Sequence, residues 1–268
     1  MEKDVMARLH DHYAEALEYF PEDRIVGIFL QGSQNYGLEV PGSDVDTKLI
    51  VTPTFEEIAF NSKPHSTTHV RANDEHIDFK DIRLMLGTFR KQNLNFLEIL
   101  FTPYKIINPL YAEQWARLEA ENEAIAHYNI YSAVKAMKGV ALEKYHAMEH
   151  RYPAKIEIID RMGYDPKQLH HLLRVEDYLE RYIHGESYTG CLKPTDPAYL
   201  KEVKLGKYTL EEARVEADRA LAHIEEICAP FNKDSEFNVD NKAVDLLLDD
   251  VQRNIMRDAI KLELLGKE

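Results

Sequence analysis

RIVGIFLQGSQNYGLEVPGSDVDTKLIV (residues 24–51) is the stretch that decides the fold. It opens with a short apolar, β-branched run, which predicts a buried strand that ends at Gly32-Ser33. A polar loop follows, and a second apolar run then begins with Asp44 and Asp46. Because strand side chains alternate between the two faces of a sheet, we expect both carboxylates to point to the same side.

The two acids and the Gly-Ser turn have a chemistry in common. Neighbouring carboxylates repel each other, and a divalent metal ion between them removes the repulsion. Mg²⁺ suits hard oxygens and is usually held by one or two carboxylates, waters and substrate phosphates. Gly32 would let the backbone approach such phosphates, and Ser33 offers a hydroxyl and an amide. Each motif alone is usually a turn or a solvated loop end, but together they predict a metal-nucleotide site.

A third acid follows in a predicted hairpin. A polar turn at 72–75 separates two alternating runs, 67–71 and 76–80. In the second run Asp78 shares one face with two other polar residues, and we interpret it as the third carboxylate of the site. The alternative is an ordinary solvent-facing strand residue. Asp81 precedes an apolar helical pattern and is best explained as a helix N-cap.

The composition limits the class of protein. The 268 residues are 44% hydrophobic, enough for one large or two modest cores. No apolar run approaches the roughly 18 residues of a membrane span, and no apolar signal core is present, so we expect a cytoplasmic protein without membrane insertion. Cys191 and Cys228 are too isolated for a disulfide framework or a zinc site. The formal charge of −14 disfavours broad wrapping of nucleic acid but leaves room for a local basic cleft.

The pattern of the chain changes after its first 107 residues. Before that point we expect a helix at 2–20 and a short crossover helix after the second strand, whereas residues 95–101 fit either a strand or a tight helical turn. Beyond it, amphipathic patterns predict helices at 110–125, 130–150, 154–162, 166–184, 210–228 and 240–265. The sequence therefore predicts an α+β protein with a sheet-containing domain at 1–107 and an α-helical domain at 108–268.

One of these helices carries a basic stripe. Lys167, His170 and Arg174 recur at helical spacing on one face, with His171 beside them. In a protein this acidic, such a stripe can bind a triphosphate or an acceptor's phosphate, so we include its first three residues in a nucleotide-binding set. The alternative is a solvated helix face, because acidic residues follow closely.

The motifs GSQNYGL (32–38), PGSDVD (41–46) and the later Asp78 resemble the DNA polymerase β nucleotidyltransferase superfamily, and most closely its predicted bacterial and phage nucleotidyltransferases. The likeness covers roughly residues 20–105. The segment GYDPKQLHHLLR (163–174) also looks like the C-terminal region of that branch.

The resemblance implies a mixed-sheet catalytic domain in which Gly32 and Ser33 hold the β- and γ-phosphates of a nucleotide. Asp44, Asp46 and Asp78 would bind Mg²⁺ or Mn²⁺ and support in-line displacement at the α-phosphate, with pyrophosphate as the leaving group. Asp78 would also be the base that takes a proton from the acceptor hydroxyl.

The sequence departs from that pattern in two places. Many relatives carry a basic residue where Gln34 stands and a Gly where Leu49 stands. Lys48, two residues after Asp46, can face the same site and supply the charge that Gln34 lacks. We therefore place Lys48 in the nucleotide-binding set.

Three functions are compatible with these residues. We expect a metal-dependent nucleotidyltransferase that moves a nucleoside monophosphate from an NTP to an acceptor hydroxyl, and the intact set of three acids favours it. A catalytically silent nucleotide-binding module, for instance half of a toxin-antitoxin pair, is the alternative, and a metal phosphohydrolase is a third reading. The acceptor stays open among an RNA end, a small molecule and a protein side chain, and the oligomeric state stays open too. No RNA-binding module or aromatic-basic platform narrows the choice.

Overall fold

The computed structural model describes residues 2–266, which pack into two compact units. The first unit contains the described residues of Met1–Asn35, Gly42–Tyr128 and Asp240–Glu268, and the second contains Tyr36–Pro41 and Asn129–Val239. The division expected from the sequence, at residue 107, differs from this in three respects. Residues 108–128 and the last helix belong to the first unit, and a short part of the loop after the Gly-Ser turn belongs to the second.

A mixed sheet forms the centre of the first unit. Its strands are β1 (Ile25–Gln31), β2 (Asp46–Val51), β3 (Ser66–Val70), β4 (His76–Asp81) and β5 (Lys105–Ile107). They lie in the order β3-β4-β2-β1-β5, with β2 and β4 parallel and the other neighbours antiparallel. The predicted α+β class, mixed sheet and hairpin are confirmed. Strand β5 is not predicted from the sequence, because three residues are too few to show a period.

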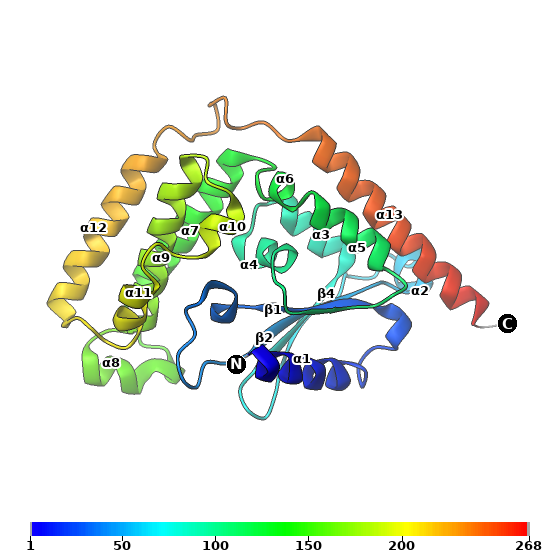
Figure 1. Ribbon diagram of the computed structural model, residues 1–268, viewed down its shortest axis with the longest axis horizontal. Coiled ribbons are helices and arrows are strands. Elements are labelled where there is room, and N and C mark those ends of the chain that lie inside the picture. The colour runs from blue at the N-terminus through cyan, green and yellow to red at the C-terminus, as the bar shows by residue number, and fades with distance from the viewer. Residues whose placement is uncertain (1, 267–268) are drawn as a thin grey trace. The chain divides into compact units, whose positions relative to one another are not determined.

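Helices cover both faces of this sheet. The helices of the first unit are α1 (Glu2–Ala16), α2 (Phe55–Ala59), α3 (Ile82–Arg90), α4 (Leu94–Leu97), α5 (Ala112–Ala120), α6 (Asn122–Ala126) and α13 (Lys242–Leu265). On one face, Ile28 and Leu49 pack with Leu9 of α1 in a buried cluster. On the other, the ring of Phe29 lies 4.3 Å from that of Trp115 in α5. Figure 1 shows α1 on one side of the sheet and α3, α5 and α13 on the other.

Two local expectations are settled around α3 and α4. The Asp81 side chain accepts a hydrogen bond from the Arg83 N–H at 2.8 Å, which confirms Asp81 as the N-cap of α3. The ambiguous residues 95–101 are helical, because α4 is followed by the 3₁₀ helix η3 (Glu98–Leu100). The buried Glu98 therefore lies on a helical turn beside the sheet.

Strand β2 begins two residues later than expected. Its first residue, Asp46, pairs with Gln31 at the end of β1, and Asp44 lies in exposed chain before the strand. Gly42, with φ of +82°, turns the chain just ahead of it. The prediction that Asp44 opens the strand is therefore wrong, and strand alternation does not fix the direction of its side chain.

The last helix joins the first unit through ion pairs. Arg90 of α3 donates from Nε to Asp245 at 2.8 Å and from Nη2 to Asp249 at 2.6 Å. The hydroxyl of Tyr128 also donates to Asp245, at 3.0 Å. Because these partners lie some 120 to 160 residues apart in the chain, amphipathic periodicity alone could not assign α13 to this unit.

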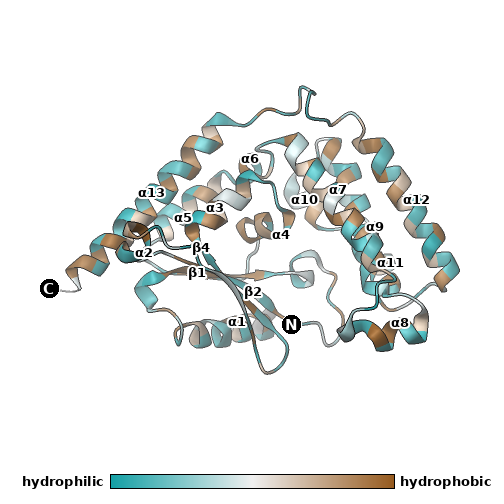
Figure 2. Ribbon diagram, turned by 180° about the vertical axis from the view of Figure 1, so that it is seen from behind, coloured by the Kyte–Doolittle hydropathy of each residue, from teal (hydrophilic) through white to brown (hydrophobic). Residues whose placement is uncertain are grey.

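The second unit is helical. Its helices are α7 (Ile130–Ala147), α8 (Ile156–Met162), α9 (Pro166–Ile183), α10 (Tyr188–Leu192), α11 (Pro197–Lys204) and α12 (Leu210–Cys228). Helices α7, α9 and α12 pack against one another, and Figure 2 shows the mixture of polar and apolar residues along α12 that such packing requires. The short helices α10 and α11 are not predicted from the sequence. Among residues 2–266, no helix combines the length and the apolar character needed to cross a membrane.

Candidate functional site

The turn after β1 and the acids before β2 meet at one end of the sheet. Gln31, the last residue of β1, is the register partner of Asp46, the first residue of β2. Gly32-Ser33 therefore leaves the sheet beside the point where Val45 enters it. We call this end of the sheet, with the turn and the Asp44–Asp46 segment, the open end.

Side-chain and backbone hydrogen bonds hold the Gly-Ser turn. Gly32 adopts φ of +96°, and a Cβ there would meet no atom within 4 Å, so the requirement for glycine is conformational. Its N–H donates to Glu98 Oε1 at 3.1 Å, and the Asn35 side chain donates to the Leu30 carbonyl at 3.1 Å. Within residues 2–266 the Ser33 hydroxyl has no hydrogen-bond partner, so it is available to a ligand. Glu98 is not among the site residues predicted from the sequence.

Asp78 and Lys48 form an ion pair across the parallel strands. They are register partners on β4 and β2, and Lys48 Nζ lies 3.1 Å from Asp78 Oδ2. The Thr68 hydroxyl donates to the other oxygen of Asp78, Oδ1, at 2.5 Å. The ring of Phe96 covers the ammonium, with its centroid 4.3 Å from Nζ. Both oxygens of Asp78 are thus engaged by neighbouring side chains.

The pKa values follow from this pairing. Burial raises the pKa of Asp78, but the Lys48 ammonium and the Thr68 hydroxyl outweigh it, so the pKa of Asp78 is lowered. Burial lowers the pKa of Lys48, and the carboxylates of Asp78 and Glu98 only partly oppose this. A carboxylate with a lowered pKa is a weak base, which counts against Asp78 as the group that takes a proton. Lys48 is 2% exposed, so its ammonium does not reach out to a triphosphate.

The chain around Asp46 is fixed by groups from the β3–β4 hairpin. Asp46 Oδ1 accepts a hydrogen bond from the His76 N–H at 2.9 Å, and the His76 ring nitrogen Nδ1 lies 3.4 Å from it. The N–H of Val45 donates to Glu75 Oε1 at 3.0 Å. Asp44 has no hydrogen-bond or ion-pair partner among the described residues and is exposed. The backbone of the Asp44–Asp46 segment is therefore held by the hairpin, the Asp46 carboxylate is partly engaged by His76, and the Asp44 carboxylate is exposed.

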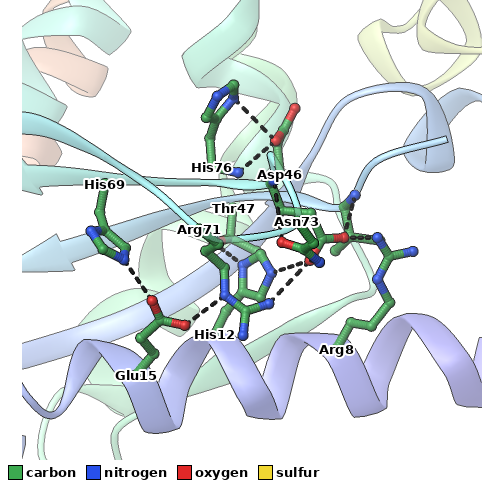
Figure 3. Close-up of polar contacts among 11 residues, drawn as sticks. Arg8, His12, Glu15, Asp46, Thr47, His69, Arg71, Asn73 and His76 are labelled. Atoms are coloured by element: carbon green, nitrogen blue, oxygen red, sulfur yellow. Dashed lines mark hydrogen bonds and ion pairs between the residues drawn. The ribbon is translucent and has the colours of Figure 1, made fainter.

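Glu75 is the centre of a buried polar cluster beneath this segment. It is 1% exposed and forms ion pairs with Arg8 of α1 and with Arg71 of the hairpin, the latter at 3.1 Å. The Asn73 side chain donates to it at 2.8 Å, and His12 Nε2 lies 3.0 Å away. Figure 3 shows these groups converging from α1 and the hairpin. We call the set the Glu75 cluster.

The protonation of His12 follows from its partners. An ionised Glu75 can only accept, so His12 donates from Nε2, and its Nδ1, 2.9 Å from the Thr47 hydroxyl, accepts. Burial, with help from the Arg71 charge, lowers the pKa of His12 to about 4, which keeps the ring neutral. His12 thus joins Glu75 to Thr47, the residue that follows Asp46. This cluster is not predicted from the sequence, because Glu75 lies in a pattern typical of a polar turn and His12 in one typical of a helix.

The side chains at the open end fit the expected metal ion only in part. Among residues 2–266, no three His, Cys, Asp or Glu side chains gather in a way that could hold one. The three-carboxylate arrangement therefore does not fit, because both oxygens of Asp78 are bound to Lys48 and Thr68. Asp44 and Asp46 do fit the chemistry of Mg²⁺, which commonly uses one or two protein carboxylates and takes its other ligands from water and phosphates.

The basic stripe expected on α9 separates into three different environments. Lys167 is exposed, whereas His170 is 2% exposed with Nδ1 2.8 Å from the Leu200 carbonyl. Burial lowers the pKa of His170 to about 4, so it contributes no positive charge near neutral pH. The Arg174 guanidinium lies 3.7 Å from the ring centroid of Tyr36, within the second unit. The structure therefore does not keep the three residues on one open face.

Comparisons with known proteins add little to this picture. No protein-family model matches the chain, and no curated protein matches it. One solved structure, a nucleotidyltransferase-like protein from Exiguobacterium sibiricum, aligns with 87% of this chain and 77% of its own, at 15% sequence identity and a TM-score of 0.33. A TM-score this low does not establish a shared fold.

Proposed function

We propose that the protein binds a nucleoside triphosphate at the open end of the sheet and transfers its nucleoside monophosphate to an acceptor hydroxyl, with release of pyrophosphate. The observation that carries this proposal is the register pair of Gln31 and Asp46. It brings a glycine turn with an available serine hydroxyl next to the exposed Asp44 and the partly exposed Asp46, whose side chain is 34% exposed. A phosphate group and a metal ion that offsets its negative charge can therefore bind side by side.

Each group has a physical role in this proposal. The Ser33 hydroxyl would bind a phosphate oxygen of the nucleotide. Asp44 and Asp46 would hold Mg²⁺ or Mn²⁺, which supplies positive charge to the triphosphate. The Lys48–Asp78 pair supports the neighbouring strands and keeps a paired charge beneath the site. The Glu75 cluster keeps the backbone of the acids in place before substrate arrives.

The test is a transfer assay with α-³²P-labelled NTPs, Mg²⁺ or Mn²⁺, and separate pools of RNA, protein and metabolites. We expect label on a component of one pool and release of unlabelled pyrophosphate. Asp44→Asn and Asp46→Asn are each expected to reduce transfer by about 100-fold or more, because each removes a carboxylate that would hold the metal ion at the triphosphate. Free labelled nucleoside monophosphate without acceptor labelling would instead identify a hydrolase.

The matched control is Asp74→Asn. Asp74 is exposed in the β3–β4 turn, and its φ of +63° is one that asparagine adopts readily. The same charge is removed outside the open end, so transfer should stay within about twofold of the wild type. Full activity in both Asp44→Asn and Asp46→Asn would overturn the proposal.

A catalytically silent nucleotide-binding module is the second candidate, favoured by two features. Asp78 is already neutralised by Lys48, and the Gly32 N–H is already donated to Glu98. Calorimetry of the wild type with ATP and Mg²⁺ distinguishes both candidates from a protein that binds no nucleotide. Metal-dependent binding without label transfer in any pool would support the silent module.

A further inference from the structure

We propose that the second unit contains a separate binding site for a phosphate-bearing small molecule, in a groove of about 450 Å³ between α8, the start of α9 and the end of α11. This goes beyond the proposed transfer reaction and does not depend on it. We call this the basic groove. Its lining includes four cationic side chains, Lys155, Arg161, Lys167 and Lys204.

Tight turns bring these cations together. Helix α8 ends at Gly163, whose φ of +81° reverses the chain toward α9. Asp165 then caps α9 by accepting from the Lys167 N–H at 2.9 Å, and the Tyr164 hydroxyl donates to the Tyr208 carbonyl at 2.9 Å. Tyr164 and Asp165 are both buried, so the backbone that carries Lys167 is firmly held. The fold itself therefore holds the backbone that lines the groove in place.

Two of the four cations of the groove are not used by internal ion pairs. Among the described residues, the side chains of Arg161 and Lys167 have no hydrogen-bond or ion-pair partner. Lys155 makes only a long ion pair with Asp165, at 3.9 Å. Lys204 donates a hydrogen bond to the Leu38 carbonyl, at 3.4 Å. Four positive charges face two carboxylates in the lining, those of Glu157 and Asp165.

A second cavity in the same unit shows the contrast. Its volume is about 310 Å³, and it is also lined by arginines. There, Arg219 forms a two-pronged pair with Glu176, at 2.6 and 2.9 Å, and Arg181 donates to Glu186 at 2.6 Å. Internal carboxylates satisfy those guanidinium groups, whereas the basic groove has an excess of cations in a protein of formal charge −14. An external anion is the group that would offset this excess.

The groove also touches the loop that connects the Gly-Ser turn to the acids. Val40 lines it, and Lys204 bonds the carbonyl of Leu38 in the same loop. Lys204 can turn from that long bond to a bound phosphate, because its four-carbon stem is flexible. Occupancy of the groove is therefore expected to change the exposure of the backbone at 36–41.

The experiment measures binding of inorganic triphosphate to the full chain by calorimetry without divalent metal at low ionic strength. We expect saturable binding that weakens as salt is raised. The double variant Arg161→Gln with Lys167→Gln should weaken binding by about tenfold or more, because two charge-assisted bonds are lost. The matched control, Lys193→Gln with Lys233→Gln, removes the same charge from exposed positions of this unit and should change affinity less than about twofold.

A second arm distinguishes the groove from the open end. Asp44→Asn with Asp46→Asn should bind triphosphate as the wild type does, whatever happens to nucleotide transfer. ATP in place of triphosphate, still without metal, shows whether a nucleotide or only its phosphate chain is recognised. Equal affinity of the groove variant and its control, or no binding by the wild type at millimolar triphosphate, would overturn the proposal.

Discussion

The two sides of the Asp44–Asp46 segment are built in opposite ways. On the inner side, the Glu75 carboxylate is 1% exposed and is surrounded by Arg8, His12, Arg71 and Asn73, so its charge is matched within the protein. On the outer side, Asp44 and the Ser33 hydroxyl have no partner among residues 2–266. The comparison shows that polar residues close together in the sequence are either matched within the protein or left without an internal partner, depending on which side they face.

The largest effect is expected for Glu75→Gln, which breaks the inner side. The change leaves Arg8 and Arg71 beside a neutral amide and weakens the acceptor for the Val45 N–H. Removing one partner of a buried charge network typically costs about 3 kcal/mol or more. Urea denaturation at pH 7 should show a loss of this size in the free energy of unfolding.

Asp74→Asn is the control for this variant as well. It removes one carboxylate from the same turn, but an exposed one, and should alter stability by less than about 0.5 kcal/mol. Equal stability of the Glu75→Gln variant and this control would mean that the inner cluster does not hold the segment.

The second effect is the pH dependence of the free energy of unfolding that follows from the neutral His12. Its pKa is about 4 in the folded chain and near 6.5 when unfolded, so below pH 6.5 the unfolded state binds a proton that the folded state does not. Stability is therefore lost as the pH falls from 6.5 toward 4. Between pH 7 and pH 5 the loss through His12 is about 2 kcal/mol. Urea denaturation at both values measures it.

Two variants isolate the contribution of His12. His12→Gln should reduce the difference between the two pH values by most of that amount, although its stability at pH 7 is also lower. His10→Gln, on the exposed face of the same helix, should retain the wild-type difference. His170 in the second unit, with a pKa also lowered to about 4 by burial, produces a further loss in all three proteins. An unchanged pH dependence in His12→Gln would contradict a neutral, buried ring.

Local patterns predicted the elements of the outer side well. The apolar runs before Gly32 and after Asp46 identify β1 and β2, and alternation on β4 places Asp78 on the polar face. The mixed sheet followed from the resemblance of the motifs. What failed locally was the position of Asp44, because a strand begins where a partner exists, and β1 ends opposite Asp46.

The inner side could not be predicted from the sequence. Glu75 contacts Arg8 and His12, more than 60 residues away, and no periodicity connects a hairpin turn to the first helix. The pairing of Asp78 with Lys48 likewise depends on parallel register, which a sequence of alternating residues does not specify. Basic spacing on α9 gave the right helix, but His170 turned out to be a buried neutral residue.

The smallest effect is expected for a change at Arg174, which stacks on Tyr36 in the loop after the Gly-Ser turn. Arg174→Lys keeps the charge but loses the planar stacking on Tyr36, whose ring centroid lies 3.7 Å from the guanidinium carbon. The expected loss of stability is about 1 kcal/mol or less. Hydrogen exchange should show faster exchange at residues 36–41 than in the wild type, with little change in α12.

Arg151→Lys is the matched control, because Arg151 is exposed and its pair with Asp160, at 2.7 Å, can be kept by lysine. Equal exchange in both variants would mean that stacking on Arg174 does not hold the loop.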